Sequence, residues 1–187
     1  MIKSFTTDKL TITPSLREES EELDSIRVSV KYISAWMSKE ANEMDGNIKD
    51  GFLTGWDVPL GRSSDDYQML TVRLNRENKI IGYLGLFHKY PEEHGIWISI
   101  LAIHPDFQKC GYGYNVVEAL LRHLTKESRY KYVSLSIDLK NWPALCFWLK
   151  AGFTEYVKYV GDKDYSKESF PKLVLKHSIK RWNREQT

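Results

Sequence analysis

The stretch that decides the fold is QKCGYG, at residues 108–113. It lies between an apolar run, Ile96 to His104, and a segment from Asn115 onward whose apolar residues recur at helical spacing. Glycines let a backbone turn sharply and adopt positive φ, so that successive N–H groups can converge on one point. A following helix adds unpaired amides and the positive end of its dipole. The stretch is therefore either an anion site for a phosphate group or a plain tight turn.

Two familiar phosphate-binding loops are excluded by their spacing. A Rossmann fingerprint requires a third glycine three residues after the second, and Val116 stands at that position. A nucleotide-hydrolase P-loop requires Gly-Lys followed by Ser or Thr, which residues 108–113 lack. The loop suits a diphosphate, but neither of those two nucleotide-binding motifs is indicated.

A second informative stretch, NWPALCFWLKAGF, runs from Asn141 to Phe153. Asn141 suits a helix N-cap, Pro143 suits the first turn, and Gly152 suits the residue after the last turn. Ala144 is small, which leaves room for a ligand or for another backbone. Taken alone, a packed helix explains the whole stretch.

Outward from these stretches, the pattern predicts strands that alternate with helices. Helices are predicted from Leu23 to Met37, as one helix or two, behind a capping box of Ser15 and Glu18, and also from Asn115 to Leu124 and from Pro143 to Ala151. Glycines and a proline interrupt Asp45 to Asp66, which is either a surface excursion or a substrate lid. The predicted strands are Leu10–Thr13, Met69–Leu74, Lys79–His88, Ile96–His104, Tyr132–Ile137, Phe153–Val160 and Lys172–His177.

The composition is that of a globular domain: 187 residues, 42% hydrophobic and 28% charged. No apolar run approaches the roughly 20 residues that cross a bilayer, and the opening residues lack the pattern of a secretion leader. Two cysteines, Cys110 and Cys146, cannot supply a disulfide framework or a complete zinc site. A net charge of +2 argues against nucleic acid as the main partner. We therefore expect a cytoplasmic protein with no metal, membrane or nucleic-acid partner.

Together, the two stretches resemble the GNAT superfamily of acyl-CoA-dependent N-acyltransferases. Residues 108–113 match its Gln/Arg-x-x-Gly-x-Gly/Ala motif, and 141–153 match its Asn-x-x-Ala-x-x-Phe-Tyr-x-Lys-x-Gly-Phe signature at every position but one. The resemblance implies a mixed α/β fold: a mostly antiparallel sheet of about seven strands, flanked by helices, whose fourth and fifth strands splay apart. It implies one domain over 1–187, with an acceptor side at about 15–66 and an acetyl-CoA-binding core at about 95–160.

The resemblance also implies where acetyl-CoA binds. Its pyrophosphate would lie on the loop amides, with Tyr114 nearby, and its pantetheine arm would insert between the splayed strands. Ala102 and Ile103 would bind the arm by strand-like hydrogen bonds, and the Ile103 amide would be the oxyanion donor. The implied cofactor-binding residues are Ala102, Ile103, Gln108, Lys109, Cys110, Gly111, Tyr112, Gly113, Tyr114, Asn141, Ala144, Phe147 and Trp148. Phe147 could equally be a core residue instead of a cofactor contact, and Asn141 could serve as a helix cap.

The reaction implied is direct attack of a primary amine on acetyl-CoA, which requires a group that takes a proton from the amine and one that reprotonates the thiolate. The chain departs from the family pattern at both positions. Trp148 replaces the usual acidic tyrosine, and Trp97 replaces a glutamate that some relatives use as a base. Glu93 and His94, just before Ile96, are the substitute bases, or else solvated turn residues.

The acceptor side leaves two alternatives open. Acidic residues outnumber basic ones eight to four between Arg17 and Asp45, which favours a cationic amine such as a polyamine or an aminoglycoside, or a charged helix face turned to water. Trp36, Phe52 and Trp56 could instead line an apolar acceptor pocket. A protein amino group is a further possible acceptor.

Two functions from different classes compete. The first is an N-acetyltransferase, and the second is an acyl-CoA sensor with little chemistry, favoured by the tryptophans at both proton-transfer positions. A homodimer is plausible because strand edges and a terminal hairpin are exposed in this arrangement.

Overall fold

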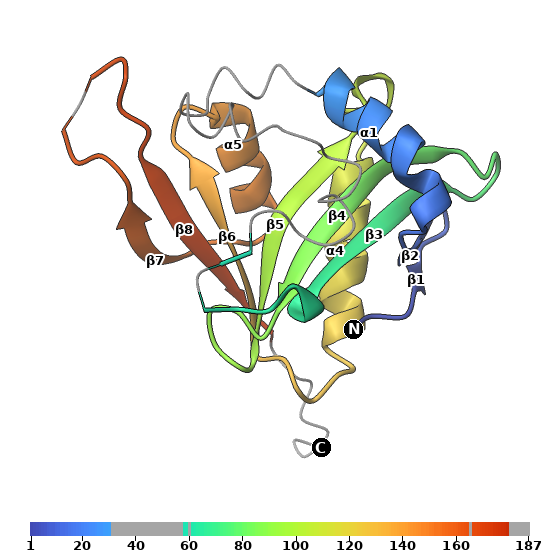
Figure 1. The fold of residues 1–187 in the computed structure, drawn as a ribbon, viewed down its shortest axis with the longest axis horizontal. Helices are drawn as coiled ribbons and strands as arrows, with labels where there is room; N and C mark the ends of the chain where they lie inside the picture. The colour runs from blue at the N-terminus through green and yellow to red at the C-terminus, as the bar shows by residue number, and fades with distance from the viewer. Residues whose placement is uncertain (31–57, 60, 165, 180–187) are drawn as a thin grey trace.

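The computed structural model describes residues 1–30, 58–59, 61–164 and 166–179. Within them lies one sheet of eight strands in the order β1-β2-β3-β4-β5-β6-β8-β7 (Figure 1). The strands are β1 (Phe5–Thr6), β2 (Leu10–Pro14), β3 (Tyr67–Leu74), β4 (Ile80–His88), β5 (Gly95–Ile103), β6 (Tyr132–Asp138), β7 (Glu155–Val160) and β8 (Lys172–Ser178). The helices are α1 (Ser20–Ser29), α4 (Tyr112–Leu124) and α5 (Trp142–Lys150), with 3-10 turns η1 (Arg17–Glu19), η3 (Ser64–Asp66) and η4 (Pro105–Phe107).

This architecture confirms the predicted mixed α/β class. Neighbouring strands are antiparallel except for β5 and β6, which are parallel. The sheet has one strand more than expected because Phe5 and Thr6 pair with Ile12 and Thr11. The two-residue β1 is too short to show an alternating pattern in the sequence.

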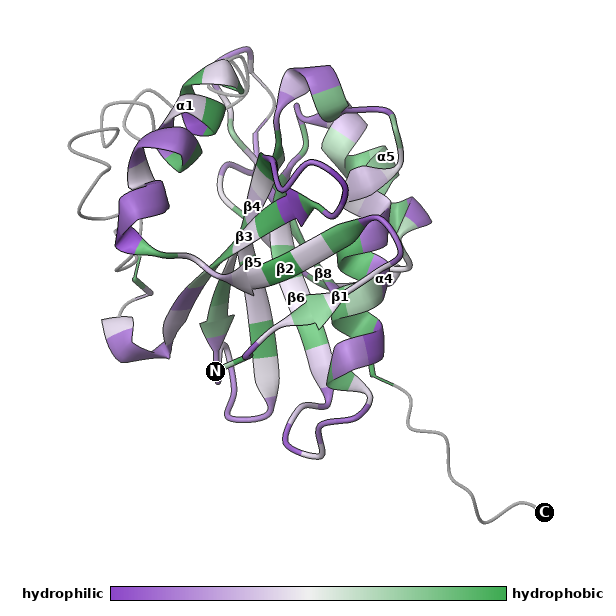
Figure 2. Cartoon of the chain, turned by 90° about the vertical axis from the view of Figure 1, so that its right-hand side faces the viewer, coloured by the Kyte–Doolittle hydropathy of each residue, from purple (hydrophilic) through white to green (hydrophobic). Residues whose placement is uncertain are grey.

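Helices cover both faces of the sheet. On one face, α4 packs its buried residues Val116, Val117 and Leu120 against the larger core cluster, which also holds Leu145 of α5. On the other face, α1 contributes Leu23 and Ile26 to a second cluster. Figure 2 shows the matching alternation of hydrophilic and hydrophobic residues along α1. None of the helices in the described ranges is both long and apolar enough to cross a membrane.

The start of each helix differs slightly from the sequence prediction. The capping box of Ser15 and Glu18 is wrong by one residue, because the Leu16 N–H donates to Glu19 Oε2 at 3.0 Å. Glu19 is buried and forms an ion pair with Arg73 of β3, so its carboxylate ties η1 to the sheet. α4 begins three residues before Asn115, and the predicted continuation of the first helix to Met37 lies outside the described residues.

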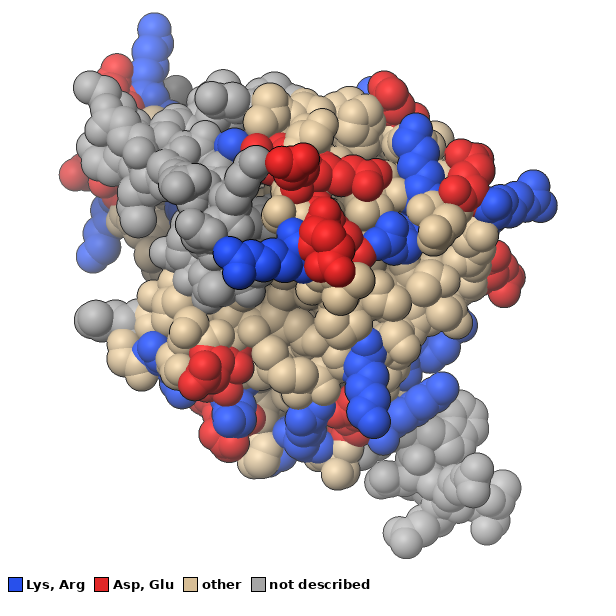
Figure 3. All heavy atoms as spheres, turned by 45° about the vertical axis from the view of Figure 1, so that its right-hand side comes forward, with Lys and Arg blue, Asp and Glu red and all other residues tan. Residues whose placement is uncertain are grey.

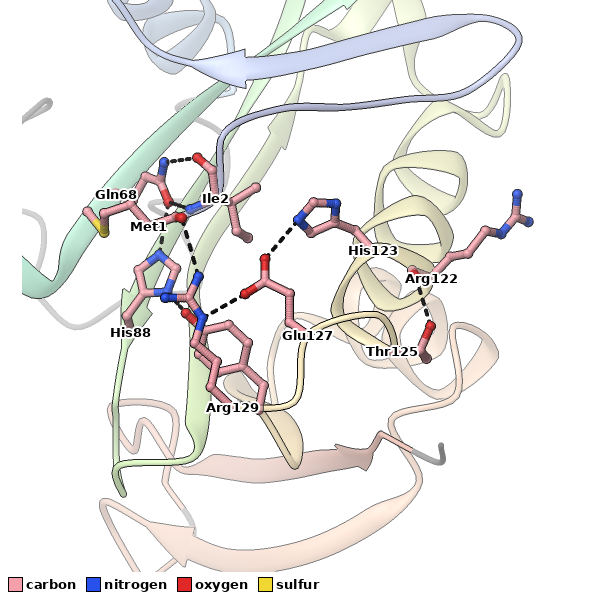
Figure 4. Close-up of polar contacts among 10 residues, drawn as sticks. Met1, Ile2, Gln68, His88, Arg122, His123, Thr125, Glu127 and Arg129 are labelled. Carbon is pink, nitrogen blue, oxygen red and sulfur yellow. Dashed lines mark hydrogen bonds and ion pairs between the residues drawn. The ribbon is translucent and has the colours of Figure 1, made fainter. Parts of the chain in front are cut away.

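A buried polar cluster holds the first residues against β3 and β4 (Figure 4). Gln68 bonds both backbone groups of Ile2: its Oε1 accepts from the N–H at 2.8 Å and its Nε2 donates to the carbonyl at 2.7 Å. His88 Nε2 lies 2.9 Å from the same Oε1, and its Nδ1 lies 2.6 Å from Tyr130 Oη. Because the amide oxygen can only accept, Nε2 carries the proton, and Nδ1 of a neutral ring accepts from Tyr130.

Candidate active site

β5 and β6 separate after a short parallel contact, as Figure 1 shows. Their paired residues are Gly95 with Tyr132, Ile96 with Val133 and Trp97 with Ser134, although both strands continue well beyond. The expected splaying of the two central strands is therefore confirmed. From Ser99 onward, the margin of β5 that faces β6 has no strand beside it among the described residues.

The register decides which backbone groups of β5 face this gap. The His104 N–H donates to the Ile81 carbonyl at 2.8 Å, so Ile103 and its partner Gly82 do not exchange hydrogen bonds. The N–H and carbonyl of Ile103 therefore point toward β6, and the carbonyl accepts from Gln108 Nε2 at 2.8 Å. Leu101, two residues earlier, has the same orientation.

Ala102 faces the other way, which corrects the sequence-based assignment of its backbone to the pantetheine arm. It pairs with Tyr83 of β4, and its carbonyl lies 2.3 Å from the Cβ that Gly82 would carry if it were alanine. Its hydrogen-bonding groups thus belong to the β4–β5 ladder. Leu101 replaces Ala102 as the second residue, beside Ile103, whose backbone faces the gap. The sequence could have indicated Leu101, because backbone groups two residues apart in a strand point the same way.

The loop after β5 has the backbone expected of an anion site. Lys109 and Gly111 have left-handed φ angles of 59° and 82°, and Gly111 is the N-cap of α4. The Asn115 N–H makes the first bond of the helix, to the Gly111 carbonyl at 3.0 Å. The amides of Tyr112 to Tyr114 therefore precede the helical ladder and lie at the positive end of its dipole. Lys109, Cys110, Gly111 and Tyr114 are exposed.

Gly113 is the point where the loop, β5 and α5 meet. A Cβ at this position would lie 3.4 Å from the Phe147 ring and 3.8 Å from Ile103 Cγ1. These are ordinary contacts, so the surrounding chain would accept an alanine. What the missing side chain provides is open backbone beside the end of β5, where a ligand can approach.

On α5, the structure separates residues that the sequence motif groups together. Asn141 caps the helix, its Oδ1 accepting from the Ala144 N–H at 3.1 Å. Trp148 is only 8% exposed and packs edge-on between Phe147 and Phe153, with ring centroids 4.9 and 5.1 Å away. Trp148 is therefore part of the core, and its expected role in lining the cofactor stays a prediction.

The two substitute bases do not lie with Ile103. Glu93 and His94 are exposed and precede β5, whereas Ile103 ends it. At about 3.3 Å per residue, the ends of this strand are roughly 26 Å apart. His94 Nδ1 also lies 2.9 Å from the Arg129 carbonyl, and both residues precede their strands whereas the loop follows β5. Both side chains thus lie at the N-terminal end of β5, and their assignment as substitute bases stays a prediction.

Asp138, at the end of β6, is a titratable group at the opposite margin of the gap. Burial raises the pKa of its carboxyl, and the ammonium of Lys172, 3.6 Å from Oδ1, opposes that rise. The main-chain carbonyl of Asp138 accepts from the Asn141 N–H at 2.9 Å, which closes the turn before α5. The described residues contain no group of three or more His, Cys, Asp or Glu side chains that could hold a metal ion.

The splayed strands, the loop on a helix N-terminus and the order of elements define a class of acyl-CoA-dependent transferases, as the resemblance predicted. The chain belongs to the acetyltransferase (GNAT) family, whose sequence profile matches residues 32–153.

Individual relatives agree with this assignment. The spermine/spermidine N(1)-acetyltransferase of Bacillus subtilis (strain 168) is 28% identical over 102 residues, which are 52% of this chain and 64% of that protein. The chain thus matches less than two thirds of this curated relative. A probable GNAT acetyltransferase from Chromobacterium violaceum superimposes with a TM-score of 0.69 at 16% identity, over 94% of this chain and 86% of that one. Spermidine N-acetyltransferase from Vibrio cholerae, solved with CoA and spermine, gives 0.66 at 11% identity, over 92% and 97%.

Proposed function

We propose that this protein transfers an acetyl group from acetyl-CoA to a primary amine by direct attack. One observation carries the proposal: the unpaired margin of β5 leads directly into a loop whose amides lie exposed at a helix N-terminus. An extended ligand with amide groups along its length and a diphosphate at one end complements both parts. Family membership supports acetyl-CoA as that ligand.

In this proposal, the diphosphate binds the backbone amides of residues 108–113, with Tyr114 beside it. The pantetheine arm runs back along β5 in the place of a missing strand, bonded to Leu101 and Ile103. Asn141, Ala144 and Phe147 lie toward its other side. The sites thus fall within the core proposed at about 95–160, and the acceptor enters from the side of residues 15–66.

The length of the arm moves the reacting carbonyl away from Ile103. From phosphate to sulfur, the arm has about as many bonds as four extended residues, or roughly 14 Å. Counted back from Ile103, next to Gly113, that distance ends near Ser99. Leu101 is the residue nearest to that point whose N–H the register turns toward the gap, so we propose its amide as the donor to the thioester carbonyl, with Ile103 bonding the arm. One such donor contributes about 3 kcal/mol to stabilising the transition state.

The acceptor that we propose to test first is a polyamine. Glu18, Glu21 and Glu22 are exposed on η1 and α1, over the face opposite α4. Figure 3 shows acidic and basic side chains interspersed on the face in view, so the attraction would be local. The curated relative named above acts on spermine and spermidine. Trp36, Phe52 and Trp56, the alternative apolar wall, lie outside the described residues.

The first experiment is calorimetric titration of acetyl-CoA and CoA, followed by thiol release with a panel of polyamines, aminoglycosides and peptides. Micromolar binding with turnover of one amine class is the expected result. Binding without turnover of any amine would favour the acyl-CoA sensor. That alternative has specific support, since Trp148 is buried and Trp97 packs edge-on against Tyr90 at 5.4 Å. Absence of binding would overturn both functions.

The homodimer and the cytoplasmic location stay predictions. β7 is an edge strand with apolar side chains in water, Tyr156 being 63% exposed. Light scattering on the purified chain would test the dimer directly.

A further inference from the structure

Asp138, the last residue of β6, has a buried carboxylate oxygen without a hydrogen bond. Its Oδ1 has no hydrogen-bond partner among the described residues. The Lys172 ammonium of β8 lies 3.6 Å away, beyond hydrogen-bond length, and 39% of the Lys172 side chain is exposed to water. Buried polar atoms in proteins almost always have a partner. A ligand with an N–H group would supply the donor that this oxygen lacks.

The side chain of Asp138 lies on the face of the sheet that α1 covers. On β6, Val133, Leu135 and Ile137 belong to the core cluster on the opposite face, under α4 and α5. Because side chains alternate along a strand, Ser136 and Asp138 lie on the α1 face, where Ser136 is exposed. This is the face from which the acceptor enters in the proposed function.

Asp138 and Leu101 occupy equivalent places on the two margins of the gap between β5 and β6. The last pair of these strands is Trp97 with Ser134, and Leu101 and Asp138 each lie four residues beyond it. An arm that takes the place of a missing strand would run between them, about 5 Å from either strand. The Leu101 amide and the Asp138 carboxylate would therefore flank the same part of the arm, close to the thioester carbonyl.

We propose that Asp138 is the base that takes the proton from the acceptor ammonium, an inference that rests on the acetyltransferase function. An amine with a pKa of about 10 is almost entirely protonated at pH 7 and has no free electron pair in that form.

The proposed step balances in atoms and charge. The ammonium gives one proton to the Asp138 carboxylate, and the neutral nitrogen bonds to the carbonyl carbon. The C–S bond breaks with its electron pair on sulfur, and a second N–H proton passes to that sulfur. Asp138 then releases its proton to water. The products are an N-substituted acetamide, the free thiol of CoA and one proton.

The surroundings of Asp138 suit this role. Burial raises the pKa of its carboxyl, and a carboxylate of higher pKa is a stronger base. Among the described residues, the charged group that acts on this carboxyl is the Lys172 ammonium, which opposes the rise. The sheet also fixes the position of Asp138, which pairs with Lys172, while the Leu139 N–H donates to the Pro171 carbonyl at 2.9 Å. A rigid strand end holds a reacting group in a constant geometry.

The test measures kcat from about pH 5 to pH 9.5, and the calorimetric Kd for acetyl-CoA, in Asp138→Asn and Asp138→Glu. The acceptor is spermine, or whichever amine of the panel reacts fastest. We expect kcat of Asp138→Asn to fall at least tenfold at pH 7, with Kd within twofold of wild type, because asparagine keeps the shape and accepts no proton. The loss should shrink as the pH rises toward about 10, where the amine is neutral without a base. Asp138→Glu keeps the carboxylate and should retain more turnover than Asp138→Asn.

Two further variants separate proton transfer from structural effects. Lys172→Gln removes the ammonium that stabilises the Asp138 carboxylate, so the pKa of Asp138 should rise and the acidic limb of kcat should move to higher pH. Glu155→Gln is the matched control, since Glu155 Oε2 lies 3.2 Å from Lys176 of the same strand β8. Its kcat and its pH profile should equal those of the wild type.

The outcomes separate the base from the function on which it rests. Unchanged kcat in Asp138→Asn would overturn the base, as would a loss of the same size at every pH, and either result leaves the acetyltransferase standing. Acetyl-CoA binding without wild-type turnover of any amine would overturn both. If Asp138→Asn fails to fold, Lys172→Gln decides: an acidic limb at higher pH supports the base, and an unmoved limb overturns it.

Discussion

At the scale of single residues, Gly111 shows why the loop sequence is restrictive. Its φ of 82° lies in the left-handed region, and no atom of the described residues lies within 4 Å of the Cβ that a larger residue would carry. A larger side chain at position 111 would therefore meet no steric clash with its neighbours. It would instead strain the backbone of residue 111 and block an approaching ligand. Lys109 adopts the same region without being glycine, which costs about 1 kcal/mol and marks the loop as locally strained.

We predict that Gly111→Val weakens CoA binding at least tenfold, because the side chain disfavours the turn and blocks the approach of the phosphates. Calorimetric titration measures the effect. Gly61→Val is the matched control, since Gly61 also has a left-handed φ, 77°, with open space around it. It should show a similar loss of stability, about 1–2 kcal/mol, with unchanged CoA affinity. Equal affinity in both folded variants would remove the loop from the site.

A second residue-scale prediction concerns Trp148→Tyr, which restores the usual family residue. The change leaves a void between Phe147 and Phe153 and buries a hydroxyl, so we expect the free energy of unfolding to fall by about 2 kcal/mol with no gain in turnover. Denaturant unfolding and thiol release measure the two quantities. Trp142→Tyr, 66% exposed on the same helix, should change neither. A tenfold rise in turnover would show that residue 148 reaches the thiol.

At the scale of elements, the cluster that holds β4 to Ile2 requires a neutral His88. Burial, followed by neighbouring positive charges, lowers the pKa of His88 from its ordinary value of 6.5 to about 4. Burial likewise raises the pKa of Tyr130 to about 12, which keeps the phenol protonated as the donor to Nδ1. The ring therefore binds no proton in the folded state at a pH where the unfolded chain does.

This difference makes stability depend on pH in a defined direction. Above pH 6.5 neither state is protonated at His88, and stability is complete. As the pH falls from 6.5 to about 4, the unfolded state gains a proton first and stability falls by about 3 kcal/mol. Urea unfolding at pH 7, 5.5 and 4 measures the loss. His88→Gln, which can still donate to Gln68 and accept from Tyr130, should lack this part of the pH dependence, and an identical profile would contradict it.

How far the sequence predicts each element depends on whether its signals are local. The cap, proline and terminal glycine of α5 all lie within thirteen residues, and the helix was predicted nearly to its ends. The pairing of β5 is decided by β4 and β6, far away in the chain, so sequence motifs placed Ala102 rather than Leu101 on the cofactor side. Glu93 and His94 were close to the site in sequence, but an extended strand carries them away from it.

At the scale of the whole molecule, the sheet consists of two antiparallel parts joined along a short parallel contact. β1 to β5 form one part, and β6, β8 and β7 form the other. A ligand hydrogen-bonded along the open margin of β5 would add contacts between these two parts of the sheet. At a concentration 100 times its Kd, such a ligand stabilises the fold by about 2.7 kcal/mol.

Hydrogen exchange at single amides tests this arrangement. We predict that the amides of Leu101 and Ile103 exchange quickly in the free protein and become protected when CoA binds. The amides of Ala102 and His104 should be slow in both states, because they are bonded within the β4–β5 ladder. These neighbours are internal controls for any general stabilisation. Protection of all four amides to the same degree on binding would contradict the strand-like placement of the arm.

The short contact between β5 and β6 also bears on how long the molecule survives in a cell. Its two parts share three register pairs, from Gly95 with Tyr132 to Trp97 with Ser134. Separation along this line exposes the strands on both sides to proteases, at a frequency set by the free energy of opening. In the proposed complex the pantetheine arm lies along this line, so saturating acetyl-CoA should slow cleavage of the purified protein by an added protease.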